Sequence, residues 1–351
     1  MGSLGTPALV LVFALGAVAT WVAGIYLSKT TDALDNRLGL GEALGGMILL
    51  AIAGSLPELA ITISAVLSGN LGLAAGNLIG GIAIQTLVLV VLDATVRGER
   101  PLSFLIGSLT PVLEALLVVA VVGVMLMGTQ LPESASIGGV VSPASLLIVL
   151  VWIGGIFVLN RFRKSEAWQV HAPESKPGRP HVRVEHPTAP RPYATATTTI
   201  VVLVFGLGSL VTLGAGYVLA ESGNVLADRM GMTGAVFGAT VLAAVSALPE
   251  ISTGIAAVRL GDHQLAAGDI FGGNAFQLCL FLLADLLALS PVLPETAPSD
   301  IYLGTIGALL TAIVAAAIVA RPRRRFLRLG IDSILLVALY AAAIALLPQV
   351  T

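Results

Sequence analysis

The sequence predicts an all-α polytopic membrane protein, with ten transmembrane helices in two inverted five-helix repeats and broken helices at two LPE motifs. The first observation is composition: 56% of the 351 residues are hydrophobic and 11% are charged, with a mean hydropathy of +0.97. Soluble domains carry about twice that share of charge. The second is the length of the apolar runs, which repeatedly reach about 20 residues, enough to cross a bilayer core as a helix. The third is an internal repeat, described below.

The apolar runs and the polar residues between them define the expected helices. The first run is longer than the apolar region of a signal peptide and lacks a basic segment before it, so it is expected to be a retained span. The ten expected spans cover about 6–28, 41–68, 71–94, 104–128, 142–161, 197–221, 232–259, 264–288, 299–320 and 328–348.

The positions of Lys and Arg predict the orientation. If the N-terminus is external, only Arg229 of the 18 Lys and Arg residues falls outside the cytoplasmic segments, as the positive-inside rule requires. Both termini are then external, and the plasma (inner) membrane is the expected location. The proline-rich, basic stretch 162–196 is expected to be a cytoplasmic linker. It separates a first repeat at 1–161 from a second at 197–351.

The two halves share one register, in which adding 192 to a residue number gives its counterpart. Leu56, Pro57 and Glu58 correspond to Leu248, Pro249 and Glu250, and Asn77 corresponds to Asp269. Further matching pairs are Gly69 and Gly261, 73–76 and 265–268, Gly80 and Gly272, Gly81 and Gly273, and Gln85 and Gln277. An odd number of spans separates the copies, so they are inverted, as in secondary transporters, which place the substrate site between the repeats.

The repeated Pro-Glu pair carries the functional hypothesis. Pro57 and Pro249 each remove a backbone donor and open a helix, which exposes carbonyl oxygens in the membrane. Glu58 and Glu250 follow directly, although an ionised side chain at the centre of a membrane helix costs about 3 kcal/mol. Two idle carboxylates at such positions would be expected to disappear.

Four side chains are expected to converge as ligands: Glu58, Asn77, Glu250 and Asp269. Asn77 and Asp269 are each expected to open the helix that follows the one with the glutamate. Their oxygens carry a charge of up to −3 and suit Ca²⁺, which takes six to eight oxygen ligands. Cys279 is the single cysteine and no histidine lies in a span, which disfavours softer metals. Na⁺ would use the same oxygens, and mutual repulsion of the carboxylates makes H⁺ a natural exchange partner.

Other polar residues lie within or near the expected spans, and some of them have two interpretations. Glu114 is either an accessory proton-handling group or a partner of a neighbouring helix. Gln85 and Gln277 either support the site or join helices by unrelated hydrogen bonds. Asp93 and Asp285, near span ends, are expected to reach water. The arginine cluster at 321–328 is expected to anchor the topology.

At these motifs the sequence resembles the cation/Ca²⁺ exchanger superfamily, in particular the sodium/calcium exchanger type, with a first α-repeat motif at about 41–94 and a second at about 233–288. The resemblance implies that Glu58 and Glu250 are central ligands. It also implies sliding of the first and sixth helices across a rigid core. It further implies supporting ligands at Ala51, Ser55, Ala243 and Ser246, and a role around the site for Asn274.

The sequence departs from the family at hydroxyl positions. Thr-Ser usually precedes Leu-Pro-Glu, whereas this chain has Gly54-Ser55 and Ser246-Ala247. Leu73 and Leu265 stand where sodium-coupled relatives have serine. These changes weaken the case for Na⁺ coupling more than the case for a divalent site.

The function predicted is secondary-active antiport, with export of Ca²⁺ in exchange for Na⁺ or H⁺ by alternating access. Antiport of another cation (Mg²⁺, Mn²⁺, or Na⁺/H⁺ exchange) is the alternative, followed by a channel and a membrane-embedded carboxylate hydrolase. The last is disfavoured because the carboxylates are symmetry mates rather than an acid and a base in different environments. The chain is expected to be no enzyme and to need no cofactor. Its expected partners are the lipid bilayer and inorganic cations, with no nucleic acid, and the sequence leaves its oligomeric state open.

Overall fold

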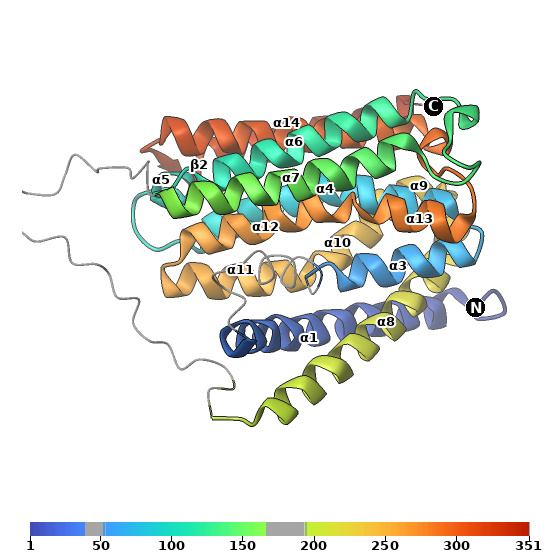
Figure 1. The fold of residues 1–351 in the computed structure, drawn as a ribbon, viewed down its shortest axis with the longest axis horizontal. Coiled ribbons are helices and arrows are strands. Elements are labelled where there is room, and N and C mark those ends of the chain that lie inside the picture. Colours follow the sequence, from blue (N-terminus) through green and yellow to red (C-terminus); the bar gives the residue numbers. More distant parts are fainter. Residues whose placement is uncertain (39–51, 53, 166–192, 194, 351) are drawn as a thin grey trace, which may run out of the picture.

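The computed structural model describes residues 1–38, 52, 54–165, 193 and 195–350, and within them it is a bundle of long helices (Figure 1). The helices of the first half are α1 (Thr6–Leu38), α3 (Leu56–Leu67), α4 (Leu71–Thr95), α5 (Leu102–Leu105), α6 (Thr110–Gly128) and α7 (Pro143–Ser165). Those of the second half are α8 (Thr198–Arg229), α9 (Gly234–Phe237), the π-helical turn η2 (Gly238–Leu242), α10 (Ala243–Ser246), α11 (Leu248–Leu260), α12 (His263–Gln277), α13 (Leu280–Ala288), α14 (Pro298–Ala320) and α15 (Ile331–Leu346). Short 3₁₀ turns cover Glu133–Ala135, Leu293–Glu295 and Leu347–Gln349, and strands β1 (Arg325–Phe326) and β2 (Leu329–Gly330) form a hairpin.

Nine segments within the described ranges are long and apolar enough to cross a membrane, and α3 is a shorter apolar helix. The expected span at 41–68 lies partly outside the described residues. The expected ends of the first and sixth spans, at 28 and 221, are too early because α1 continues to Leu38 and α8 to Arg229. Segments that mix polar and apolar residues, 29–38 in α1 and 222–229 in α8, continue both helices beyond the apolar runs.

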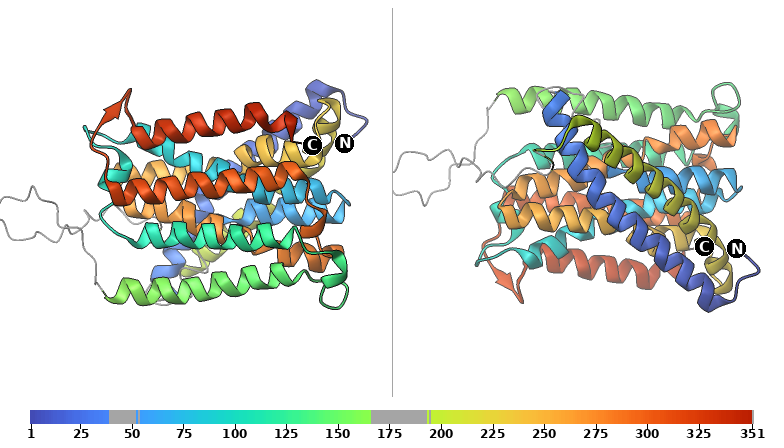
Figure 2. Two further views of the ribbon diagram at one scale, coloured as in Figure 1. Left: turned by 90° about the horizontal axis from the view of Figure 1, so that it is seen from above. Right: turned by 90° about the horizontal axis from the view of Figure 1, so that it is seen from below.

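Buried and exposed helices divide the bundle into a core and a covering pair. Most side chains of α4 are buried, and α4 packs against α3, α12, α14 and the η2 turn. By contrast, α1 and α8 pack on each other and run obliquely across the remaining helices, as Figure 2 shows. Many of their apolar side chains are exposed, as expected of helices that face lipid.

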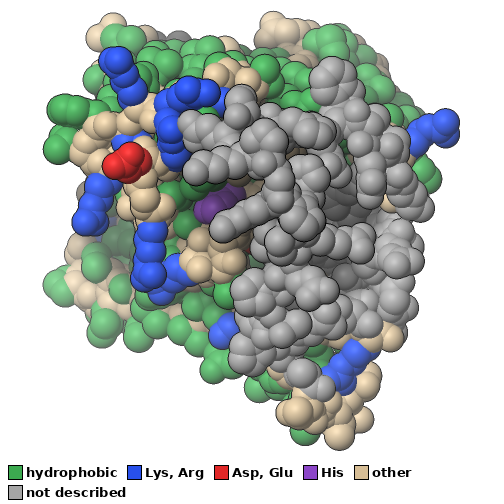
Figure 3. All heavy atoms as spheres, turned by 90° about the vertical axis from the view of Figure 1, so that its left-hand side faces the viewer, with side chains coloured by type: hydrophobic (Ala, Val, Ile, Leu, Met, Phe, Trp, Pro, Cys, Tyr) green, Lys and Arg blue, Asp and Glu red, His purple; other side chains and the backbone are tan. Residues whose placement is uncertain are grey.

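The two ends of the bundle differ in charge. Both termini lie at one end (Figure 1), and Lys and Arg side chains gather on the opposite face (Figure 3). Arg229 is an exception, because it donates hydrogen bonds to the carbonyl of Leu4 (2.6 Å) and the hydroxyl of Thr6 (3.0 Å) at the N-terminus. The structure therefore separates Arg229 from the other basic residues, as the sequence predicts.

Local backbone features confirm the repeat register. Gly69 and Gly261, which end α3 and α11, both adopt left-handed φ angles, of 74° and 83°. Asn70 and Asp262 then cap α4 and α12 by accepting hydrogen bonds from the backbone N–H three residues later, at 3.0 and 2.9 Å. The same residue types at the same offset thus end one helix and start the next in both halves.

The symmetry extends to α1 and α8. Gly24 of α1 lies against Pro249, so that an added Cβ would be 2.6 Å from the proline ring. Its counterpart Gly216 of α8 lies against Ala60 in α3. Trp21 also donates a hydrogen bond to Ser252. Each covering helix therefore touches the LPE-containing helix of the other half through a glycine.

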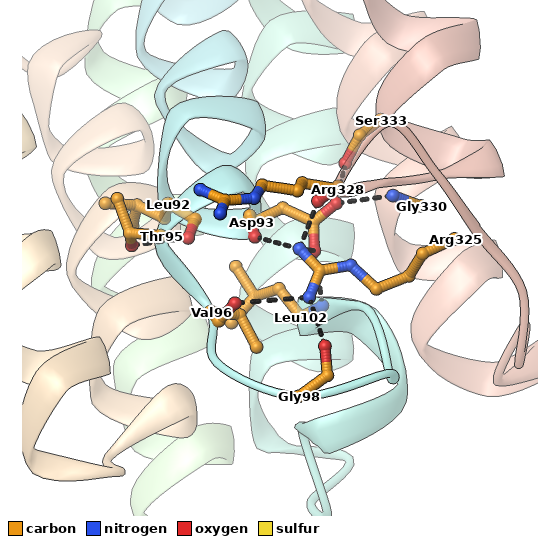
Figure 4. Close-up of polar contacts among 10 residues, drawn as sticks. All are labelled: Leu92, Asp93, Thr95, Val96, Gly98, Leu102, Arg325, Arg328, Gly330 and Ser333. Carbon is orange, nitrogen blue, oxygen red and sulfur yellow. Dashed lines mark hydrogen bonds and ion pairs between the residues drawn. The ribbon is translucent and has the colours of Figure 1, made fainter.

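Asp93 at the end of α4 is buried, with 1% of its surface exposed. Its carboxylate accepts hydrogen bonds from Leu102 N (2.7 Å), Gly330 N (2.6 Å) and Ser333 Oγ (2.7 Å), and lies 3.9 Å from Arg325 (Figure 4). Gly330 is the N-cap of α15. Asp93 of the first half therefore satisfies backbone donors at the start of the last helix of the second half.

Asp285 does the same with the halves exchanged. It is fully buried and accepts hydrogen bonds from Ser142 N (2.9 Å), directly before α7, and from Val292 N (2.7 Å). The expectation that Asp93 and Asp285 reach water is wrong. Loops of the opposite half cover both carboxylates, and helix-start N–H groups replace water as donors.

Candidate cation-binding site

The helices are interrupted at the LPE motifs, as predicted. In the second half α10 ends at Ser246 and α11 begins at Leu248, with Ala247 (φ −81°, ψ 0°) between them. In the first half α3 begins at Leu56. Proline occupies the first turn of both α3 and α11, where its missing N–H costs no intrahelical hydrogen bond. Each glutamate therefore lies in the first turn of a helix that starts inside the bundle.

Glu58 is buried, with 1% of its surface exposed. Its Oε1 accepts a hydrogen bond from Gln85 Nε2 at 3.2 Å, whereas its Oε2 is buried and finds no hydrogen-bond partner among the described residues. A buried acceptor left without a partner costs about 1–3 kcal/mol. The Glu58 carboxylate thus keeps one oxygen for a ligand.

Gln85 and Gln277 are symmetry mates that touch each other. Gln85 Nε2 donates to Gln277 Oε1 at 2.9 Å, so the pseudo-twofold axis passes between them. Gln277 Nε2 donates to the carbonyl oxygens of Leu78 (2.6 Å) and Asn77 (3.3 Å). Gln85 therefore contacts Glu58, and Gln277 contacts the backbone carbonyl of Asn77. Their supporting role at the site stays a prediction.

Asn77 is fully buried, and within the part of the chain that the structure describes neither its amide nitrogen nor its amide oxygen has a hydrogen-bond partner. The expectation that Asn77 and Asp269 open their helices is wrong, because α4 starts at Leu71 and α12 at His263. Both residues lie well inside their helices, since the caps Asn70 and Asp262 start these helices directly after the left-handed glycines. They therefore lie deeper in the bundle than the sequence suggested.

Glu250 and Asp269 form the second half of the group. Both are partly buried, and Glu250 lies within electrostatic range of Glu58 and of Asp269. Glu250 Oε2 is buried, and no residue in the described ranges forms a hydrogen bond with it. Thr253 Oγ1 donates to Asp269 Oδ2 at 3.2 Å. Sequence reasoning missed Thr253, although its position three residues after Glu250 puts both on one face of α11.

The predicted supporting residues lie around the helix breaks. Ser246 Oγ donates to the Ala243 carbonyl at 3.2 Å, and both residues are fully buried. Ser55 is buried at the start of α3 and its side chain makes no capping hydrogen bond. Ala51 lies outside the described residues, so its predicted carbonyl ligand stays a prediction.

Asn274 and Glu114 contact residues of the neighbouring helices. Asn274 Nδ2 points to the Ile82 carbonyl (3.5 Å) and to Thr86 Oγ1 (3.4 Å). Glu114 of α6 is buried and packs against α12, because a Cβ on Gly268 would lie 2.8 Å from its Oε2. Glu114 therefore contacts the residue next to Asp269.

The donor set limits the ions that fit. In the ranges that the structure describes, no three His, Cys, Asp or Glu side chains come close enough to hold a metal ion by themselves. The oxygens at hand are two carboxylates, Glu58 and Glu250, with amide, hydroxyl and carbonyl oxygens beside them. Such a set is typical of hard cations that accept mixed oxygen ligands.

Comparisons with known proteins identify the family. The sequence profile of the family described as "Sodium/calcium exchanger protein" matches residues 8–160 and 200–347. "Inner membrane protein YrbG" of Escherichia coli (strain K12) is 27% identical over 249 residues, which is 71% of this chain and 70% of that protein. "Putative antiporter CaxA" of Alkalimonas amylolytica is 25% identical over 255 residues, 72% of each chain.

Solved structures show the same fold. The H⁺/Ca²⁺ exchanger CAX has a TM-score of 0.68 and 15% identity, covering 97% of this chain and 81% of that one. The sodium-calcium exchanger NCX_Mj has a TM-score of 0.59 and 16% identity, covering 96% and 98%. The profile matches most of the chain, in one segment per half. The chain therefore belongs to the sodium/calcium exchanger protein family, whose members are membrane cation antiporters and not enzymes.

Proposed function

We propose that the chain exports Ca²⁺ in exchange for H⁺, with Na⁺ as the alternative counter-ion, and that Glu58 and Glu250 hold the transported ion. One observation carries the proposal: these symmetry mates lie in the first turns of the two helices that start at the LPE breaks, and each keeps a buried oxygen for which the described residues offer no hydrogen-bond partner. A cation placed between the two carboxylates would satisfy both oxygens.

Charge balance favours a divalent ion. Two ionised carboxylates inside a low-dielectric bundle are expensive unless their charge is compensated. One Ca²⁺ compensates Glu58 and Glu250 fully, and so do two protons. The same pair can therefore be neutral when it carries Ca²⁺ in one direction and when it carries H⁺ in the other, which is the requirement for alternating access with a membrane-buried site.

Leucine at two positions favours H⁺ over Na⁺. Leu73 and Leu265 occupy the positions where the family resemblance places serines of sodium-coupled exchangers; Leu73 is 1% exposed and Leu265 is 51% exposed. A leucine supplies no oxygen to a flanking Na⁺. Asn77 supplies the additional oxygen that we assign to the Ca²⁺ site, and Asp269, held by Thr253, lies beside the site as a neighbouring acidic group.

Transport into inside-out vesicles tests the proposal. We expect ⁴⁵Ca²⁺ uptake to follow an imposed pH gradient and to be indifferent to a Na⁺ gradient. Glu58→Gln and Glu250→Gln should each abolish uptake, because each removes a charge without changing shape. Glu133→Gln, in the exposed turn between α6 and α7, is the matched control and should transport normally.

The outcomes separate the alternatives. Uptake driven only by a Na⁺ gradient would show that Na⁺, and not H⁺, is the counter-ion. Uptake without a gradient of any second ion would indicate a channel. Normal rates in both glutamine variants would remove the site assignment. We also place the chain in the inner membrane, with its basic end in the cytoplasm and both termini outside. Labelling of single cysteines introduced at the two ends checks that orientation.

A further inference from the structure

The connection between α14 and α15 carries an exposed apolar tip. It spans residues 321–330 and contains the β1–β2 hairpin, in which Phe326 is paired with Leu329. Phe326 is 65% exposed and Leu327 is 81% exposed, the highest value among the large hydrophobic side chains of the described residues. Because α14 ends at Ala320 and α15 begins at Ile331, and both are membrane spans, this tip must lie at the membrane boundary.

Basic side chains surround the tip. Arg323, Arg324 and Arg328 are exposed, and the segment "RPRRRFLRLG" contains no acidic residue. The hairpin lies on the face of the bundle where Lys and Arg gather (Figure 3). An apolar pair flanked by arginines is the side-chain pattern of segments that bind the interface of an anionic membrane.

The backbone of the tip is strained and firmly held. Leu327 and Arg328 have φ angles of 50° and 70°, a left-handed region that residues other than Gly, Asn and Asp seldom adopt. Arg325 holds the base of the hairpin, because its guanidinium donates to the carbonyls of Asp93 (2.7 Å) and Gly98 (3.0 Å) (Figure 4). A strained turn persists only where its surroundings fix it.

We propose that this hairpin binds the headgroup of an anionic phospholipid of the surrounding membrane. Arg323, Arg324 and Arg328 contact the phosphate, and Phe326 and Leu327 enter the boundary between headgroups and acyl chains. The bound lipid stabilises the cytoplasmic end of α4, because Arg325 and Gly330 connect the hairpin to Asp93. This site is separate from the proposed cation site and does not depend on which ion is transported.

Thermal unfolding of the purified full-length chain in a non-ionic detergent tests the proposal. We expect phosphatidylglycerol to raise the unfolding midpoint, whereas phosphatidylcholine with the same acyl chains and inorganic phosphate leave it unchanged. Arg323→Gln/Arg324→Gln should raise the half-saturating lipid concentration about 25-fold, at roughly fivefold for each arginine near an anionic surface.

Leu327→Asn keeps the test interpretable, since asparagine tolerates the left-handed conformation and should fold at least as well in detergent. Loss of the leucine side chain should weaken the lipid response about tenfold. The matched control is Arg161→Gln/Arg259→Gln, which removes two exposed arginines at the ends of α7 and α11 and should keep the wild-type response.

Four results would overturn the proposal. Equal losses in the two double arginine variants would show diffuse charge attraction instead of a site. An unchanged response in Leu327→Asn would show that the tip does not enter the lipid. A midpoint raised as much by phosphatidylcholine would remove the need for an anionic headgroup, and one raised as much by inorganic phosphate would remove the need for a lipid.

Discussion

Replacing Gly24 of α1 by alanine tests the contact between the covering helices and the helix breaks. The new Cβ would lie 2.6 Å from the Cβ and Cγ atoms of Pro249, whereas apolar carbons in contact are about 3.5–4.0 Å apart. The overlap is therefore about 1 Å. A proline ring cannot rotate away, so α1 must move off the break.

The expected cost follows from two opposing effects. Overpacking of this size costs about 1–3 kcal/mol, and replacing glycine by alanine inside a helix returns up to about 1 kcal/mol. We expect a net destabilisation of about 1–2 kcal/mol for the described conformation, equivalent to a roughly 5–30-fold change in its population. Because the family resemblance implies that α1 and α8 slide during transport, ⁴⁵Ca²⁺ uptake should fall by a similar factor.

Two further alanine variants complete this experiment. Gly216→Ala, the symmetry mate in α8, should behave like Gly24→Ala, because its Cβ would overlap Ala60 Cβ and come within 3.3 Å of Ile61 N. Gly214→Ala in the same helix has nothing within 4 Å of its Cβ and should be neutral or slightly stabilising. Equal unfolding midpoints and uptake rates for Gly24→Ala and Gly214→Ala would refute the reasoning.

Three other predictions concern the site and the connections between halves. Gly81→Ala should reduce uptake with little change in expression, because its Cβ would collide with the Gln277 amide; unchanged uptake would show that this glutamine is not held in place. Asp93→Ala and Asp285→Ala should each lower the free energy of unfolding by about 2–4 kcal/mol, since they leave several buried donors without an acceptor, and thermal unfolding in detergent measures it; wild-type midpoints would contradict the capping role. Added Ca²⁺ should raise the unfolding midpoint of the wild type but not of Glu58→Gln, and an equal rise in both would place Ca²⁺ elsewhere.

Much of the fold could be predicted because membrane helices and duplication leave direct marks in the sequence. Apolar runs of about 20 residues predicted nearly all helices. The constant offset of 192 paired Gly69 with Gly261, but it did not predict that both adopt the left-handed conformation at a helix end. Helix ends were less certain. The extension of α8 to Arg229 depends on hydrogen bonds to the N-terminus, which no local pattern reveals.

The candidate site could be predicted only as a set of residues. The sequence identified Glu58 and Glu250 because charge is expensive inside a membrane, and the structure places each of them in the first turn of a helix that starts at an LPE break. It could not show that Gln85 and Gln277 lie on the pseudo-twofold axis and touch. That contact depends on how α4 and α12 cross, which is set by packing between the halves.

The buried aspartates show a different limit. Asp93 and Asp285 lie near span ends, where water is the usual partner of a carboxylate. Their real partners, such as Gly330 and Ser142, come from the opposite half and lie more than 140 residues away along the chain. Contacts between residues this far apart in the chain cannot be predicted from the neighbouring residues in the sequence.

Equilibrium binding of ⁴⁵Ca²⁺ to the purified chain tests most directly the claim that the two glutamates form one site. We predict one bound Ca²⁺ per chain, lost completely in Glu58→Gln and lost completely in Glu250→Gln. Two bound ions per chain, or variants that each retain half of the binding, would mean that the halves hold separate sites and would contradict a shared cation cage.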